Sequence, residues 1–81
     1  MIFLPVQSRM ARAALGWGVR ELANAAKVSV DTIARFERGD ELRERTVEAI
    51  QRALEVGGIE FIDENGGGPG VRLRKPPKHK R

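Results

Sequence analysis

Apolar residues between Val19 and Gly39 are spaced in a way that predicts two short helices joined by a tight turn. They recur at the i, i+3 and i+4 positions that place side chains on one face of a helix. These residues are Leu22, Ala23 and Ala26 in the first half, and Ile33, Ala34 and Phe36 in the second. Between the halves, Val28 is apolar within the turn, and Ser29 can cap the free N–H groups of the following helix. The stretch therefore predicts two helices that cross around a turn.

Two further helices are expected on either side of this stretch. The first begins near Pro5, which a first helical turn tolerates, and ends before Gly16. Trp17 follows and is interpreted as packing on the core. The second begins at Glu44 or Thr46 and ends at Gly57 and Gly58. The expected buried residues are Val6, Met10, Ala13 and Ala14 in the first helix, and Val47, Ile50, Ala53 and Leu54 in the second.

Beyond Gly58 the apolar period changes from that of a helix to two, which predicts strands. The segment 63–70 is rich in residues that end strand pairing, so the two strands form a hairpin. The glycines there do not make a phosphate-binding loop, because no helix and no Lys-Ser or Lys-Thr follows them. A lone hairpin is marginally stable and needs a helix or a second hairpin beside it. We therefore expect it to dimerise through Ile59, Phe61, Ile62, Val71 and Leu73.

The turn region matches a specific pattern, L-A-x-x-A-x-V-S-x-x-x-I-x-x-x-E-x-G. The matching residues are Leu22, Ala23, Ala26, Val28, Ser29, Ile33, Glu37 and Gly39. The pattern resembles the helix-turn-helix of the phage-repressor/Cro class of DNA-binding domains, the XRE family. The resemblance covers Val6 to about Leu54. It implies a four-helix bundle whose second motif helix, residues 30–38, enters the major groove of double-stranded DNA.

The resemblance also implies roles for individual residues. The base-reading positions would be Val30, Asp31, Thr32 and Arg35. Asp31 has an alternative reading, because a carboxylate near a helix N-terminus stabilises the first turn without any DNA. Arg12 of the first helix would pair with Glu37, as a structural ion pair and not as part of a catalytic site. Arg9, beside Arg12, can lay its stem along the core.

The sequence departs from the family pattern at the start of the first motif helix, where Gly18 replaces the usual Ser or Thr cap, and in the turn. Val19 stands where a glutamine usually holds a DNA phosphate, so backbone N–H groups or Arg20 must provide that contact. Lys27 stands where the family commonly has a glycine in the left-handed conformation, at a cost of about 1 kcal/mol. The predicted phosphate contacts are Arg20, Ser29, Arg43, Arg45 and Lys75.

The charge distribution changes this picture only at the C-terminus. The net charge is +4 and the pI is about 10.3, which favours a polyanionic partner. No acidic residue occurs in 66–81, whereas basic residues are frequent there. The segment 75–81 is expected to be disordered and to track DNA phosphates in a salt-dependent way. Alternatively, such a tail only improves solubility.

Several functional classes are disfavoured by what the sequence lacks. It has no cysteine, and its one histidine, His79, lies in the charged tail, so we expect neither a metal site nor a cofactor. No apolar run approaches the roughly 18 residues of a membrane span, and no signal sequence is evident. Glu60, Asp63 and Glu64 lack partners for catalysis, so an enzyme is not expected. A cytoplasmic, nucleoid-associated protein of prokaryotic or phage-like origin is the expectation.

Together these observations predict a mainly α protein. A four-helix, phage-repressor-like helix-turn-helix bundle is followed by a short C-terminal β-hairpin. The predicted organisation is a DNA-binding domain at 1–58, a dimerisation hairpin at 59–74 and a basic tail at 75–81. The predicted function is a homodimeric, sequence-specific repressor that binds double-stranded DNA. The alternative is an antitoxin-like or adaptor module whose hairpin binds another protein, and a co-purifying partner would favour it.

Overall fold

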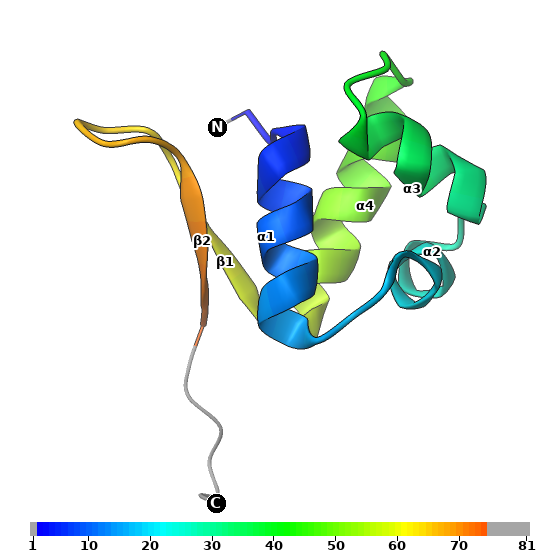
Figure 1. Ribbon diagram of the computed structural model, residues 1–81, viewed down its shortest axis with the longest axis horizontal. Coiled ribbons are helices and arrows are strands. Elements are labelled where there is room, and N and C mark those ends of the chain that lie inside the picture. Colours follow the sequence, from blue (N-terminus) through cyan, green and yellow to red (C-terminus); the bar gives the residue numbers. More distant parts are fainter. Residues whose placement is uncertain (1, 75–81) are drawn as a thin grey trace, which may run out of the picture.

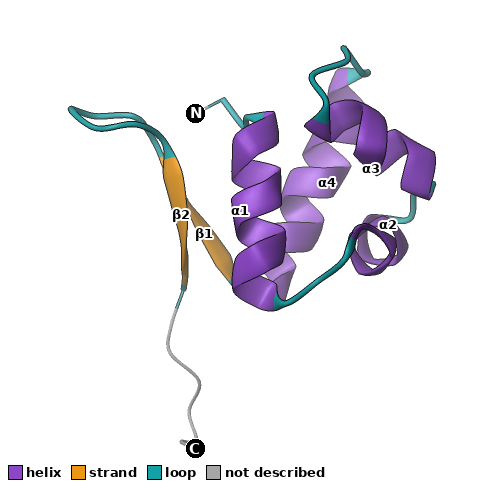
Figure 2. Ribbon diagram, viewed as in Figure 1, coloured by secondary structure: helices purple, strands orange, loops and turns teal. Residues whose placement is uncertain are grey.

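The computed structural model describes residues 2–74 as four helices followed by a β-hairpin (Figure 1). The elements are α1 (Pro5–Leu15), α2 (Val19–Ala26), α3 (Val30–Glu37), α4 (Glu44–Gly57), β1 (Ile59–Ile62) and β2 (Gly70–Leu73). α1 and α4 lie at the centre, with α2 and α3 on one side and the hairpin on the other (Figure 1). Helices and strands thus segregate along the chain (Figure 2). The predicted fold class is confirmed, and the predicted tail lies outside the described residues.

The helices end where the sequence supplies suitable stops. Gly16 caps the end of α1 and Gly58 the end of α4, with φ angles of 70° and 119° that glycine adopts without steric cost. α3 ends at Glu37, one residue before the predicted end, and Arg38 follows as its C-cap. These stops leave the short connections that fold α2 and α3 against the longer helices.

The core is formed by side chains from all four helices, from β1 and from the segment before α1. Leu22, Ile33, Ile50, Leu54 and Ile59 are its largest fully buried apolar side chains. Burying a side chain of this size contributes about 1.5–3 kcal/mol relative to leaving it in water. Trp17, Val28 and Val47 are partly buried and pack against this cluster, so the prediction that Trp17 packs on the core is confirmed.

α1 buries a different face from the one predicted. Gln7, Ser8 and Ala11 are buried, whereas Val6 is 41% exposed. The prediction that Val6, Met10, Ala13 and Ala14 form the buried stripe is wrong, since Ala13 and Ala14 are also exposed and Met10 is half-buried. The physical reason is that Gln7 and Ser8 both find hydrogen-bond partners inside the protein, which removes most of the cost of burying them.

The hairpin is antiparallel and carries a cross-strand ion pair. Its register pairs Ile59 with Leu73, Glu60 with Arg72, Phe61 with Val71, and Ile62 with Gly70. Arg72 Nε lies 2.7 Å from Glu60 Oε1 on the solvent-exposed face. Both strands contact α1, and β1 also contacts α4. A lone hairpin is marginally stable, so these contacts with two helices stabilise it within one chain.

Side chains fasten both ends of the hairpin to the helices. At one end, Gln7 Nε2 donates to the backbone oxygens of Gly70, at 3.0 Å, and Ile62, at 3.4 Å. At the other end, the Arg74 guanidinium donates twice to the backbone oxygen of Glu55, at 2.7 and 3.0 Å, near the C-terminus of α4. The hairpin is therefore part of the folded core, and its role as a separate dimerisation element stays a prediction.

Phe3 connects the hairpin to α3. Its ring stacks on Phe36 of α3 at a centroid distance of 5.0 Å and meets Phe61 of β1 edge-on at 5.0 Å. Phe3 is only 6% exposed although it lies close to the chain terminus. Aromatic pairs of this geometry contribute about 0.5–1.5 kcal/mol beyond the area they bury. The residues before α1 therefore hold two distant elements together.

We expect Phe3→Ala to lower the free energy of unfolding by about 3–5 kcal/mol, because it leaves a cavity between Phe36 and Phe61. Ile2→Ala is the matched control, since Ile2 is 75% exposed and its loss should change stability by no more than about 0.5 kcal/mol. Urea unfolding followed by circular dichroism measures both. Equal effects of the two substitutions would contradict this role of Phe3.

Candidate nucleic-acid interface

The turn between α2 and α3 is built around a left-handed lysine. Lys27 has φ 61° and ψ 44°, and it is the only non-glycine residue with positive φ among those described. The N–H of Val28 donates to the backbone oxygen of Ala23 at 3.0 Å, and that of Lys27 donates to Asn24 at 3.3 Å. A side chain in this conformation costs on the order of 1 kcal/mol, which the surrounding contacts offset. The turn thus fixes the angle between α2 and α3.

Ser29 begins α3 as its N-cap. Its Oγ accepts from the N–H of Thr32 at 3.0 Å and lies 2.9 Å from the Thr32 hydroxyl. Such a cap satisfies one of the N–H groups that a helix start leaves free and is worth about 1 kcal/mol. A hydroxyl has one donor and two acceptor positions, so Thr32 keeps capacity for a further partner. The prediction that Ser29 contacts a phosphate stays a prediction.

The two faces of α3 differ in exposure. Ile33, Phe36 and Glu37 are buried against the other helices. The predicted base-reading residues lie on the other side of the helix, with Val30 and Asp31 exposed and Thr32 and Arg35 half-buried. α3 therefore presents to solvent an edge with an apolar, an acidic, a hydroxyl and a guanidinium side chain.

Arg35 is held loosely by a neighbouring carboxylate. Its Nε lies 3.8 Å from Asp40 Oδ2, and Nη2 of Arg38 lies 2.9 Å from the same oxygen. All three side chains are more than 40% exposed, so these ion pairs contribute at most about 1 kcal/mol each. Arg35 can therefore exchange Asp40 for another acceptor at little cost.

α3 and the segment before α4 enclose a shallow polar hollow. Thr32, Arg35 and Arg43 line it, together with Glu41, Leu42 and Thr46. The structure thus brings two predicted base-reading residues beside one predicted phosphate contact. Arg45 lines an adjacent hollow with Arg43, Glu44 and Glu48, while Arg20 is exposed in the first turn of α2. Lys75 lies outside the described residues.

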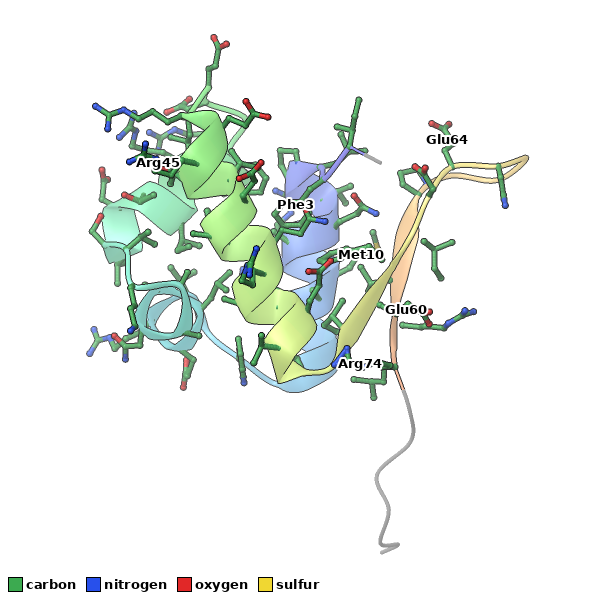
Figure 3. All side chains as sticks on the ribbon, turned by 180° about the vertical axis from the view of Figure 1, so that it is seen from behind. Phe3, Met10, Arg45, Glu60, Glu64 and Arg74 are labelled. Atoms are coloured by element: carbon green, nitrogen blue, oxygen red, sulfur yellow. The ribbon has the colours of Figure 1, made fainter. Side chains whose placement is uncertain are left out.

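The hairpin carboxylates lie away from this surface. Arg45 is found near the α3 end of the molecule, whereas Glu60, Glu64 and Arg74 lie with the hairpin on the other side of α4 (Figure 3). Glu60 is paired with Arg72, and the Asp63 carboxylate accepts from the N–H of Glu64 at 3.1 Å. These acidic groups therefore do not oppose a polyanion bound along α3.

The arrangement of α2, its turn and α3 agrees with a comparison of sequences. The family model described as a helix-turn-helix domain matches residues 8–61, more than half of the chain. The chain belongs to this helix-turn-helix family. Its matched span includes the exposed edge of α3 and the polar hollow, and membership in the family supports DNA binding. No curated protein matches the chain.

The described part of this helix-turn-helix protein contains neither a candidate metal cluster nor a membrane-spanning helix. Between residues 2 and 74, no three His, Cys, Asp or Glu side chains come together as a metal site would require. Across the same residues, no helix has the length and apolar character needed to cross a bilayer.

A buried carboxylate holds the helix-turn-helix domain together. Glu37, at the end of α3, is 9% exposed. Arg12 of α1 donates two hydrogen bonds to it, at 2.8 and 2.9 Å, and Ser8 donates a third from its hydroxyl at 2.6 Å. The Arg9 guanidinium donates to the backbone oxygen of Glu37, and Arg12 also donates to the backbone oxygen of Trp17 at 3.3 Å. α1 therefore fixes the end of α3.

These contacts change the acidity of Glu37. Burial alone would raise the pKa of Glu37, but the hydrogen bonds from Arg12 and Ser8 and the charges of Arg12 and Arg9 outweigh burial and lower it. The hydrogen bond to Glu37 raises the pKa of Arg12 in turn. Both residues therefore stay charged at neutral pH.

The resemblance to the phage-repressor family predicts the pairing of Arg12 with Glu37 but not the contacts of the residues around them. Ser8 was not singled out, and the contact of Arg9 with the backbone of Glu37 was not foreseen. The signal that could have found Ser8 is its helical spacing, because Ser8 and Arg12 are four residues apart and lie on one face of α1.

We predict that the contribution of Glu37 to stability disappears in acid. Its pKa is lower in the folded chain than the value of about 4.3 expected in the unfolded chain. At pH values between these two pKa values, the unfolded chain therefore binds more protons than the folded chain. The contribution of Glu37 to stability is complete above the unfolded pKa and is lost as the pH falls through the folded pKa.

The measurement is urea unfolding of the wild type and of Glu37→Gln from pH 7 to below pH 4. The substitution should cost about 3 kcal/mol at neutral pH, because it leaves Arg12 without its counter-charge, and the difference should shrink in acid. Glu60→Gln, which breaks an exposed pair, is the control and should cost less than about 1 kcal/mol. A difference for Glu37→Gln that stays constant with pH would contradict the prediction.

Proposed function

We propose that this chain is a sequence-specific transcriptional regulator of the XRE type, a homodimeric repressor that reads the major groove of double-stranded DNA with α3. The observation that carries the proposal is the exposed edge of α3, where Val30, Asp31, Thr32 and Arg35 face solvent while the opposite face is buried. Membership in the helix-turn-helix family supports DNA as the ligand.

Each side chain on this edge suits a different feature of a base pair. Arg35 can donate two hydrogen bonds to O6 and N7 of a guanine, and Thr32 can bond a base or touch a thymine methyl group. Val30, which is 45% exposed, offers an apolar contact for the same methyl group. Asp31 can accept from the amino group of a cytosine, although its position in the first turn also stabilises α3 on its own.

Phosphate contacts would position α3 without adding sequence information. Arg43 lies beside Thr32 and Arg35 in the polar hollow, and Arg45 lies in the hollow next to it. The side chain of Val19 cannot donate to a phosphate. Arg20, the next residue in the exposed first turn of α2, would make that contact instead. In this proposal, all three guanidinium groups contact phosphates of the DNA backbone.

The proposed dimer uses the hairpin. The hairpin lies on the far side of α1 and α4 from α2 and α3, so a two-fold contact between hairpins leaves both copies of α3 free (Figure 1). Ile59, Phe61 and Val71 pack within the chain's own core, whereas Leu73 is 42% exposed and the strands keep open edges. A dimer in the cytoplasm would then bind two half-sites about one helical turn, or a multiple, apart and block transcription by occupying them.

Arg35→Ala should weaken binding to the preferred DNA site by roughly 1–3 kcal/mol and relax the preference at one base pair. Selection from random duplex DNA at one stated salt concentration, followed by binding titrations, measures both effects. Arg38→Ala is the matched control, because Arg38 also pairs with Asp40 and carries the same charge but lies at the C-cap of α3. It should leave base preference unchanged. An unaltered preference in Arg35→Ala would show that α3 is not the reader.

Leu73→Glu should convert the dimer to a monomer, because it places a charge on the exposed apolar position of the hairpin. Sedimentation equilibrium measures the mass. Val56→Glu serves as the comparison, since Val56 is 79% exposed on α4 and lies outside the hairpin. Loss of the dimer in Val56→Glu alone would place the interface on α4. A wild-type monomer that gains mass only with another cellular protein would favour the adaptor alternative.

A further inference from the structure

Another hollow lies between α2 and the C-terminal half of α4. Its volume is about 400 Å³, and its lining comprises Trp17, Ala25, Ala26, Lys27, Ala49, Arg52, Ala53, Val56 and Gly57. Cavities of about 300–1,000 Å³ with mostly apolar walls are typical of sites for small molecules. None of the predicted DNA-contacting residues lines it, so the hollow is distinct from the proposed DNA interface.

The apolar wall is formed by a fixed aromatic ring and by small side chains. A Cβ atom at Gly57 would lie 2.9 Å from Cη2 of Trp17, so only glycine allows the indole to rest against the backbone of α4 there. Ala25, Ala49 and Ala53 leave room beside the ring. Val56, 79% exposed, adds an apolar edge. The apolar part of a small molecule can pack against such a wall.

The charged side chains of the hollow are both cations. Lys27 and Arg52 line it, and no acidic residue does. Among residues 2–74, neither takes part in any of the ion pairs. Two unneutralised cations beside an apolar wall complement a molecule with an apolar body and an anionic end.

We propose that this hollow binds a small amphiphilic carboxylate. The apolar body lies against Trp17 and the alanines of α4, and the carboxylate lies between Lys27 and Arg52. Because Lys27 is the left-handed residue of the turn, the bound anion contacts the connection between α2 and α3 directly.

A second copy of the chain is a poorer occupant. The chain does combine an exposed apolar side chain with carboxylates, at Ile2, Asp63 and Glu64, but these line a hollow beside the hairpin. A contact between two such different surfaces is head-to-tail, and it closes into a ring or continues as an open filament. A small carboxylate satisfies the two cations without this consequence.

Trp17 provides a direct reporter, because it is the only tryptophan of the chain and it lines the hollow. The experiment titrates the full chain, without DNA, with decanoate, decanol or decylamine and follows tryptophan emission. These three probes share one chain length and carry an anionic, a neutral or a cationic end group. Decanoate should shift the emission saturably, and the other two should bind about tenfold more weakly, since they form no ion pairs with Lys27 and Arg52.

Two variants locate the site. Arg52→Gln should weaken decanoate binding, whereas Arg72→Gln, which removes the same charge from the hairpin, should not. Ala49→Leu should abolish binding by filling the hollow, and circular dichroism verifies that each variant is folded. The absence of DNA keeps this result independent of the proposed function.

Three outcomes would overturn the proposal. The first is no saturable response to decanoate. The second is equal affinity for decanoate and decanol, which would show a hollow that does not select anions. The third is tryptophan emission that changes with protein concentration alone and loses this dependence in Ala49→Leu, which would identify a second copy as the occupant.

Discussion

The buried carboxylate of Glu37 is the constraint on which the rest of the structure depends. A charge removed from water needs several partners, and here every side-chain partner comes from α1. Ser8 and Arg12 reach the carboxylate, and Arg9 reaches the backbone of the same residue. Because Glu37 ends α3, satisfying its charge also determines where the proposed reader helix lies against α1. The residues that read DNA in our proposal make none of these contacts.

α1 extends this constraint to the other side of the molecule. Gln7, the residue directly before Ser8, donates hydrogen bonds to the backbone of both strands, so the helix that holds α3 also holds the hairpin. Phe3 provides a second connection, through its contacts with Phe36 and Phe61. If the hairpin pairs two copies, the distance between their α3 helices is determined by α1 and not by a flexible linker. A rigid spacing of this kind is what two half-sites on one face of DNA require.

The sequence was sufficient to predict the helices and the hairpin. It was insufficient to predict which side chains are buried where burial depends on partners far away in the chain. Apolar periodicity predicted four helices and a hairpin, because each element depends on neighbours within a few residues. The face of α1 was predicted incorrectly because Gln7 and Ser8 are buried only through contacts with Gly70 and Glu37, far away in sequence. Phe3 was overlooked as a terminal residue for the same reason. The left-handed turn at Lys27 was anticipated only through the resemblance to a family. The exposed edge of α3 lies where expected, but exposure alone does not establish which bases it reads.

The polar hollow beside α3 and the hollow between α2 and α4 differ in a way that follows from their walls. The hollow beside α3 mixes Arg35 and Arg43 with Glu41, which suits the alternating donors and acceptors of a DNA groove edge and its phosphates. The hollow beside α4 combines apolar walls with two cations, which suits a molecule with one charged end. α2 packs on both α3 and α4, and Lys27 joins it to α3. A ligand can shift an equilibrium only as far as its affinities for the two states differ. A molecule bound at Lys27 would therefore influence DNA binding only if the turn that contains Lys27 has different conformations in the free and the DNA-bound chain.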